Sequence, residues 1–133
     1  MDGLHIIADL SHCRSGLGLM TDEKSLKKTC SKLVLSSGLT IVRDLFYSFP
    51  SVEKYKSAGI TGTILLAESH FAVHTWPEIF SVTFDVYVCN FSINNNEKAK
   101  NLVDSLINVF EPSKINKQIL KRGALGIEIE SIK

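Results

Sequence analysis

The sequence predicts an α+β fold: a two-layer sandwich with a mainly antiparallel sheet and two helices on one of its faces. Short segments along the chain have the apolar weight or the alternation of strands, and two longer segments carry an apolar stripe at helical spacing. Their predicted order is strand, helix, strands, helix and strand. This order favours strands gathered into one sheet with the helices packed against it.

The N-terminal segment predicts a strand followed by a helix. Residues 3–10 carry the apolar weight of a strand, and the glycines within residues 15–19 indicate a loop. Residues 21–37 predict a helix, because apolar side chains recur there at spacings of three and four. The side chains that form this stripe are Leu26, Cys30, Leu33 and Val34. Asp22 or the preceding threonine, Thr21, can cap the start of this helix, and a glycine follows its end.

The middle of the chain predicts three further strands. Residues 39–49 and 59–67 are expected to be strands, joined by a polar connection over residues 50–58. Residues 81–91 alternate most clearly, so their side chains are expected to point to the two faces of the sheet in turn. One face of this strand carries Val82, Phe84, Val86 and Val88. The other face carries Thr83, Asp85, Tyr87 and Cys89, an unusual set for a purely structural surface.

The C-terminal part predicts a second helix and a last strand. Residues 97–110 carry an apolar stripe, and the asparagines before them can cap the helix start. The residues of this stripe are Ala99, Leu102, Val103, Leu106 and Phe110. Pro112 is expected to stop the helix. The last strand is expected within residues 115–120 or within residues 127–132.

The composition excludes several classes of function. Lys and Arg number 15 and Asp and Glu number 14, so a formal net charge of +1 gives no electrostatic case for nucleic acid or an anionic membrane. No apolar run is long enough to span a bilayer. The three cysteines are odd in number and widely spaced, which argues against a disulfide framework or a structural zinc site and fits a reducing cytoplasm. We therefore expect one cytoplasmic domain over residues 1–133, without a metal site.

The residues that carry chemistry lie between Glu68 and Cys89. A Glu-Ser-His run at 68–70 is followed by His-Thr-Trp-Pro-Glu at 74–78, and then by a strand that holds an aspartate and Cys89. This order and spacing resemble the processing and catalytic signature of the prokaryotic S-adenosylmethionine decarboxylases, which are pyruvoyl-dependent enzymes. The resemblance extends over most of the chain, from about Gly3 to Phe110.

The resemblance implies a precursor that cleaves itself between Glu68 and Ser69. A serine hydroxyl can attack the carbonyl before it and turn the amide into an ester, and β-elimination then needs a base. The family gives the role of base to the position of His74, and a histidine suits it near neutral pH. Ser69 would thereby become a covalent pyruvoyl group, an electron sink for decarboxylation. Thr61, in a glycine-bounded segment like that of the family, is expected to supply a further hydroxyl during processing.

The resemblance also implies roles in catalysis and assembly. Cys89 is expected to return a proton to the substrate carbon after carbon dioxide leaves. Phe71 is expected to line an adenine pocket, and Glu78 to bind substrate hydroxyls. The implied substrate is S-adenosylmethionine, whose decarboxylated form is the aminopropyl donor for spermidine synthesis. The implied assembly is a homodimer of cleaved protomers with active sites at the subunit interface, and the second face of the sheet is a candidate for that contact.

Two alternatives stay open at this point. A glycine and an aromatic residue usually follow the position of Glu78 in the family, whereas this chain has Ile79 and Phe80. Such changes lie near regions that shape the substrate pocket, so the same pyruvoyl chemistry on arginine or ornithine is one alternative. A non-catalytic regulatory relative is the other, although the intact Ser69, His74 and Cys89 argue against it. Taken alone, each of these residues would more often be structural, and a lone cysteine is usually a small buried hydrophobe.

Overall fold

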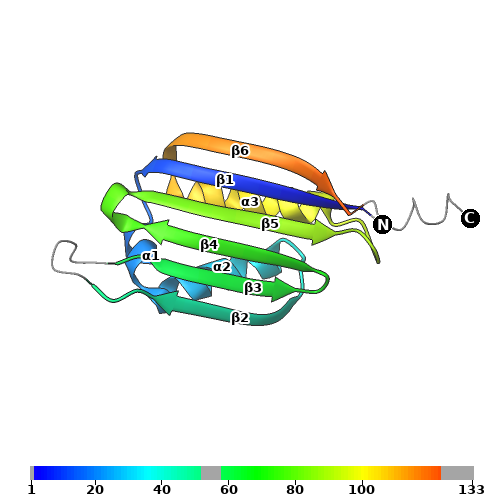
Figure 1. Ribbon diagram of the computed structural model, residues 1–133, viewed down its shortest axis with the longest axis horizontal. Helices are drawn as coiled ribbons and strands as arrows, with labels where there is room; N and C mark the ends of the chain where they lie inside the picture. The colour runs from blue at the N-terminus through cyan, green and yellow to red at the C-terminus, as the bar shows by residue number, and fades with distance from the viewer. Residues whose placement is uncertain (1, 52–57, 124–133) are drawn as a thin grey trace, which may run out of the picture.

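The computed structural model describes residues 2–51 and 58–123. Within them, six strands form one sheet in the order β2-β3-β4-β5-β1-β6, and every neighbouring pair is antiparallel (Figure 1). The strands are β1 Gly3–Cys13, β2 Ile41–Ser48, β3 Ile60–Leu66, β4 Ser69–Trp76, β5 Ser81–Cys89 and β6 Pro112–Arg122. The helices are α1 Leu17–Thr21, α2 Glu23–Ser36 and α3 Asn96–Phe110, with a short 3-10 turn η1 at Pro77–Ile79.

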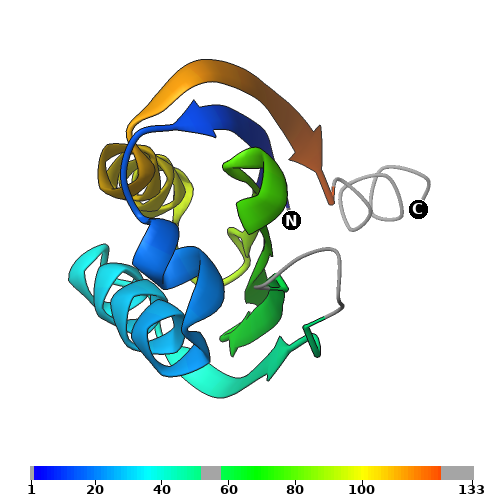
Figure 2. The same ribbon diagram turned by 90° about the vertical axis from the view of Figure 1, so that its left-hand side faces the viewer.

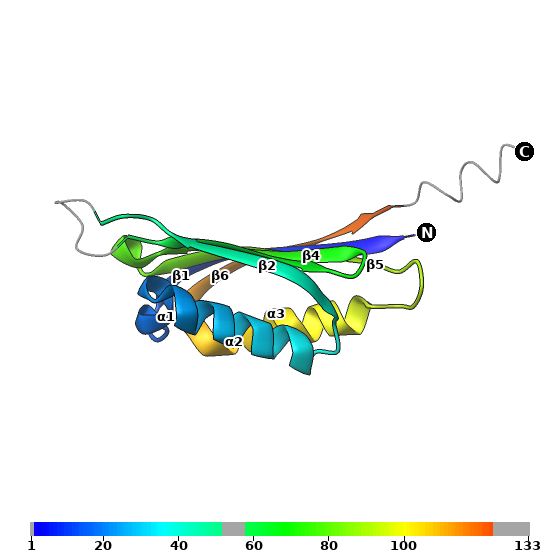
Figure 3. The same ribbon diagram turned by 90° about the horizontal axis from the view of Figure 1, so that it is seen from below.

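The sheet and the helices form two layers. All three helices lie on one face of the sheet, and no element of the described chain covers the other face (Figure 3). Viewed along the strands, the sheet curves around the helices (Figure 2). We call the two sides of the sheet the helix face and the open face. The predicted α+β two-layer sandwich with an antiparallel sheet is therefore confirmed, and no described helix is long and apolar enough to cross a bilayer.

The helix face is the core of the molecule. The apolar half of β5 is buried there as its alternation predicted, so its polar half lies on the open face. The buried residues of β5 on this side are Val82, Phe84, Val86 and Val88. The predicted helix stripes supply the other wall, and the buried members are Leu26, Cys30 and Val34 of α2 and Ala99, Leu102, Val103, Leu106 and Phe110 of α3. Leu33 packs at the margin of this core and is only partly buried.

The ends of α2 agree with the signals in the sequence, whereas at the start of α3 Asn95 makes no side-chain cap hydrogen bond and Asn94 instead accepts one from the backbone N–H of Asn96. The Asp22 side chain accepts hydrogen bonds from the backbone N–H groups of Lys24 and Ser25, which caps α2. Gly38 follows α2 at φ 95°, the left-handed conformation that glycine adopts without strain. The helix α3 ends at Phe110, one residue before Glu111 turns the chain at φ 46°.

Three expectations need correction. Residues 17–21, within and beyond the predicted loop, form the short helix α1, because Met20 is fully buried and draws this segment onto the core. The sandwich therefore has three helices on its covered face rather than two. The strand β4 was not predicted, although its alternate residues are buried. The last strand, β6, begins at Pro112 and is longer than residues 115–120, while residues 127–132 lie outside the described residues.

Candidate active site

The motif around Ser69 lies on a hairpin in the middle of the sheet. The strands β3 and β4 are joined by a two-residue turn, Ala67-Glu68, and Leu66 pairs with Ser69 across it. Glu68 has φ 61°, in the left-handed region, which costs a non-glycine residue about 1–2 kcal/mol. The peptide bond between Glu68 and Ser69 therefore follows a strained residue in a tight turn.

The predicted residues Ser69 and Cys89 lie together at one end of the sheet. The backbone N–H of Cys89 donates a hydrogen bond to Oγ of Ser69 over 3.1 Å. Cys89 ends β5 and is 6% exposed, while Ser69 is half-buried at the start of β4. The carboxylate of Glu68 accepts a hydrogen bond of 3.1 Å from the hydroxyl of Ser92. The hydroxyl of Ser69 is thus held by a backbone donor beside the strained turn.

The predicted residues Thr61 and His74 form a second pair on the open face. They lie opposite each other on β3 and β4, and Oγ1 of Thr61 is 3.2 Å from Nδ1 of His74. His74 is five residues beyond Ser69 in the same strand, a separation of about 17 Å in extended chain. The structure therefore assembles two pairs of predicted residues but does not bring the pairs together within one chain.

Two predicted substrate contacts have different outcomes. Phe71 is completely buried on the helix face, and its ring centroid lies 6.3 Å from that of Phe84. The expectation that Phe71 lines an adenine pocket is therefore corrected: the residue belongs to the core, because it shares the parity of Val73 along β4. Glu78 is exposed in η1, beyond the His74 end of β4, and its role stays a prediction.

The cavities near the turn are small. One of about 170 Å³ lies beside it and includes Glu68, Ser92 and Lys98 in its lining. Ligand pockets usually measure about 300–1,000 Å³, so this cavity alone is too small for a nucleoside-sized substrate. Another cavity, of about 650 Å³, lies at the opposite end of α3 and is lined partly by Arg14 and Glu111, away from the predicted residues.

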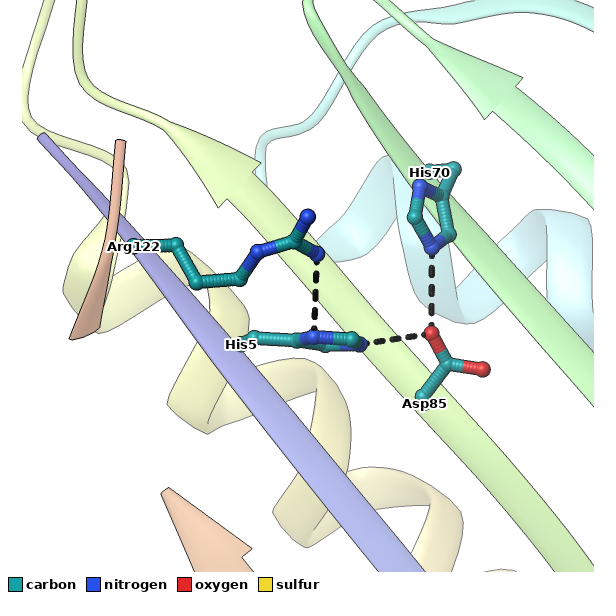
Figure 4. A network of polar contacts seen from close by, with 4 residues as sticks. All are labelled: His5, His70, Asp85 and Arg122. Carbon is teal, nitrogen blue, oxygen red and sulfur yellow. Dashed lines mark hydrogen bonds and ion pairs between the residues drawn. The ribbon is translucent and has the colours of Figure 1, made fainter. Parts of the chain in front are cut away.

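The structure also assembles polar residues that sequence analysis did not single out as site residues. On the open face, His5 of β1, His70 of β4 and Asp85 of β5 meet, with Arg122 of β6 on the outer side of His5 (Figure 4). His70 and Asp85 belong to segments of the motif, so the alternation of β4 and β5 was a signal for their shared face. The sequence alone could not place His5 or Arg122 beside them. His5 bonds to a residue 80 positions away, and Arg122 bonds to one 117 positions away.

The other two cysteines lie on the helix face and take no part in this site. Burial raises the pKa of the Cys30 thiol to about 12 and raises the pKa of Cys13 in the same direction. Both are therefore kept as neutral thiols, which is the state of an inert core cysteine.

Comparisons with known proteins agree with the motif. Residues 4–123 match the family model described as S-adenosylmethionine decarboxylase. The S-adenosylmethionine decarboxylase proenzyme of Hydrogenobaculum sp. (strain Y04AAS1) is 36% identical over 92% of this chain and 83% of its own. The proenzyme of the same name from Aquifex aeolicus (strain VF5) is 34% identical over 95% of this chain and 84% of its own.

Solved structures give the same result. The crystal structure of the adenosylmethionine decarboxylase from Aquifex aeolicus superposes with a TM-score of 0.78, at 32% identity and over 92% of both chains. The AdoMetDC-delta26 monomer of Trypanosoma brucei has a TM-score of 0.51 at 13% identity, over 98% of this chain and 50% of that one, which indicates a shared fold. With a family model that spans nearly all of its described residues, this chain belongs to the S-adenosylmethionine decarboxylase family.

Proposed function

We propose that this chain is the precursor of an S-adenosylmethionine decarboxylase, which cleaves itself between Glu68 and Ser69 and supplies the aminopropyl donor for spermidine synthesis. The observation that carries the proposal is the position of Ser69: it follows a strained turn, and its Oγ lies 3.1 Å from the backbone N–H of Cys89. The relatives named as proenzymes support self-processing and favour S-adenosylmethionine over arginine or ornithine. The whole of residues 1–133 forms the processing domain in this proposal.

Processing begins with the hydroxyl of Ser69. Its Oγ attacks the carbonyl carbon of Glu68, the C–N bond breaks, and an ester replaces the amide while the amine of Ser69 is freed. The backbone N–H of Cys89 donates to Oγ and so holds the hydroxyl in place for the attack. Breaking the peptide bond also releases the left-handed conformation at Glu68, so the strain in the turn favours cleavage.

A base then removes the α-proton of Ser69, and the bond between Cβ and Oγ breaks. Oγ leaves as part of the new main-chain carboxylate at Glu68, the end of the leading fragment. Water replaces the nitrogen of residue 69, ammonia departs, and residue 69 ends as a pyruvoyl group. Ser69 thus supplies the three carbon atoms and the main-chain carbonyl oxygen of the group, while water supplies the ketone oxygen and the side-chain carbon gains one hydrogen to become the methyl group, so the residue present fits the cofactor. When formed, the group supplies an electron sink for the bond electrons that remain after carbon dioxide leaves.

The base for this step is assigned to a second subunit. His74 is about 17 Å along the strand from Ser69 of the same chain, beyond hydrogen-bond reach. A two-fold axis that runs across the strands, between two open faces, reverses the strand direction and brings the His74 row of one chain over the Ser69 end of the other. We therefore propose a homodimer in which His74 of the partner subunit, with Thr61 of the partner subunit, serves Ser69.

Exposed apolar side chains on the open face support this assembly. Leu45, Leu65 and Leu120 are 75%, 49% and 45% exposed, and the strand register places all three on the open face. Exposed apolar groups gathered on one side of a sheet favour contact with another surface. Such a contact would also enlarge the small cavities of the single chain into a site closed by two subunits.

In the mature enzyme, Cys89 remains the proposed proton donor to the substrate carbon. Cys89 has the open-face parity of β5, and its backbone N–H contacts the residue that is to carry the cofactor. Glu78 remains a candidate contact for substrate hydroxyls. All three cysteines are free thiols, as suits the cytoplasmic setting that we propose.

The test is the intact mass of the freshly purified protein, followed by activity on carboxyl-labelled substrates. We expect fragments 1–68 and 69–133, with a pyruvoyl group at the N-terminal end of the second fragment. We also expect carbon dioxide release from S-adenosylmethionine. The Ser69→Ala variant should fold but stay uncleaved and inactive. Normal cleavage of Ser69→Ala would refute the mechanism, whereas release of carbon dioxide only from arginine or ornithine would keep the mechanism and replace the substrate. A wild-type chain that stays intact would favour the non-catalytic relative.

A further inference from the structure

A polar cluster on the open face joins four strands and has no part in the mechanism above. Oδ2 of Asp85 lies 2.8 Å from Nε2 of His5 and 3.0 Å from Nε2 of His70. On the outer side, a guanidinium nitrogen of Arg122 lies 3.2 Å from Nδ1 of His5, as Figure 4 shows. The guanidinium carbon also lies 4.7 Å from the ring centroid of Tyr87, in a cation–π contact. We call His5, His70, Asp85 and Arg122 the anchor cluster.

The contacts determine where the protons of the anchor cluster lie. Guanidinium nitrogens donate hydrogen bonds but cannot accept them, so Nδ1 of His5 carries a lone pair. The ring proton of His5 is then on Nε2, which donates to Asp85. An ionised carboxylate only accepts, so Nε2 of His70 donates to the same oxygen. The two rings are thus held by one carboxylate.

The same atoms do not suit a metal ion. One ring nitrogen each of His5 and His70 and a carboxylate oxygen of Asp85 lie within 4.8 Å of one another, close enough to be considered as a ligand set. Metal binding would need the lone pair of His5 at Nε2, and the proton of the neutral ring would then face the donor of Arg122. The guanidinium charge also disfavours a cation there. The arrangement is a hydrogen-bond network.

His70 directly follows residue 69, so the network holds the residue beside the proposed cleavage site. Before cleavage, residue 69 is held by the turn from β3 and by the bond from the Cys89 N–H to Ser69 Oγ. Cleavage as proposed removes both restraints. The peptide bond breaks, and Oγ leaves residue 69 as part of the main-chain carboxylate of Glu68. New chain ends fray unless they are tied down. The side chain nearest the new end is His70, which the carboxylate of Asp85 holds.

Resting on the proposed function, we propose that His70 is a positioning residue that fixes the cofactor-bearing end of the trailing fragment, and that Asp85, His5 and Arg122 hold its ring for this purpose. The anchor cluster matters little before cleavage, because the covalent turn restrains the same residue. It becomes necessary after cleavage. A misplacement of about 1 Å at a reacting group can lower the rate about 100-fold.

The experiment compares variants before and after cleavage. His70→Phe keeps a ring but removes the donor, whereas His70→Gln offers an amide N–H in its place. Asp85→Asn removes the charge of the acceptor, and Asp9→Asn is the matched control, since it removes a carboxylate from the exposed face of β1 outside the cluster. Each variant is made in the natural chain and in the uncleaved Ser69→Ala chain. The measurements are intact mass, kcat, KM, and hydrogen–deuterium exchange of the peptide that follows residue 69.

We expect His70→Phe to cleave normally, to lose about 10–100-fold in kcat with little change in KM, and to exchange faster at the new chain end. In the Ser69→Ala chain the same substitution should leave the exchange of this peptide unchanged. His70→Gln should recover part of kcat, and Asp9→Asn should match the natural chain. If His70→Phe does not fold, Asp85→Asn supplies the same comparison.

Faster exchange in both the cleaved and the uncleaved chain would reduce the anchor cluster to a general structural role and overturn the inference. Unchanged kcat and exchange, or a block of cleavage itself, would overturn it as well. In those cases a cleaved, active natural chain still upholds the proposed function. A natural chain that never cleaves would refute both together.

Discussion

The two faces of the sheet use alternate residues of the same strands for different purposes. In β4, Phe71 and Val73 are completely buried on the helix face, whereas His70 and His74 lie half-buried on the open face. The helix face is thus an apolar core, and the open face carries imidazoles, hydroxyls and a carboxylate. The comparison teaches that the period of two in β4 directs neighbouring residues of one motif to opposite layers: Phe71 and Val73 to the core, and the two histidines to the open face.

The largest expected effect on the open face comes from His74→Ala. Removal of a base is expected to slow cleavage about 10²–10⁴-fold while the free energy of unfolding changes little, because this ring lies outside the core. Intact mass followed over time measures the rate. Mixed refolding with Ser69→Ala chains should restore cleavage at one of the two sites of a mixed dimer. His12→Asn is the control, and mixed dimers that stay uncleaved would contradict the two-subunit site.

On the helix face, the matching prediction concerns stability. Phe110→Ala is expected to lower the free energy of unfolding by about 3–5 kcal/mol, because the side chain is 1% exposed and its removal leaves a cavity. Leu45→Ala changes an open-face position that is 75% exposed. In dilute, monomeric protein we expect it to lower the free energy of unfolding by no more than about 0.5 kcal/mol. Urea unfolding at low protein concentration measures both. Equal costs would break the distinction between the faces.

The cysteines provide a closer test, because the same substitution can be made on each face. Cys89→Ser is expected to keep cleavage, since the backbone N–H that holds Ser69 remains, but to lower decarboxylation about 100-fold. Cys30→Ser is expected to keep the activity of the folded enzyme and to cost about 1–3 kcal/mol of stability, because it buries a hydroxyl in the core. Full activity of Cys89→Ser would remove the thiol as proton donor.

The smallest effect is expected from alkylation of Cys30. Its pKa of about 12 leaves the thiol neutral at pH 8, and only the thiolate reacts with iodoacetamide. Native protein should therefore gain little label at Cys30 at pH 8 and more at higher pH, as the thiolate fraction increases, whereas unfolded protein should be labelled there readily. Peptide mass mapping at several pH values measures this. Fast labelling of Cys30 in the native protein at pH 8 would show that the core opens there.

Much of this architecture could be predicted because short-range patterns determine it. The apolar stripes located α2 and α3, and the alternation of β5 placed Asp85 and Cys89 on the correct face. The short helix α1 could not be predicted, since five residues contain too little periodicity. β4 was not predicted, because a threonine on its buried side and Ala72 and Trp76 on its open side weaken the alternation of apolar and polar residues.

The site was less predictable than its residue list. The motif predicts Ser69, His74 and Cys89 as site residues, but only the strand geometry reveals that five residues of extended chain keep Ser69 and His74 apart. Phe71 was assigned to a pocket through the family resemblance, although its parity in β4 places it in the core. The bond between Arg122 and His5 spans 117 positions, and no local pattern encodes such a contact.

The strand order has a consequence for the mature protein. β1 belongs to residues 1–68, yet it lies between β5 and β6, which belong to residues 69–133. After the proposed cleavage, the two fragments interlock along three strand boundaries: β3–β4, β5–β1 and β1–β6. The uncut chain can refold alone at a rate independent of concentration, but the cut protein must find its other fragment again, so recovery after unfolding should fall on dilution. The proposed cleavage would therefore turn a fold that can re-form from one chain into a fold that persists only while its two fragments stay together.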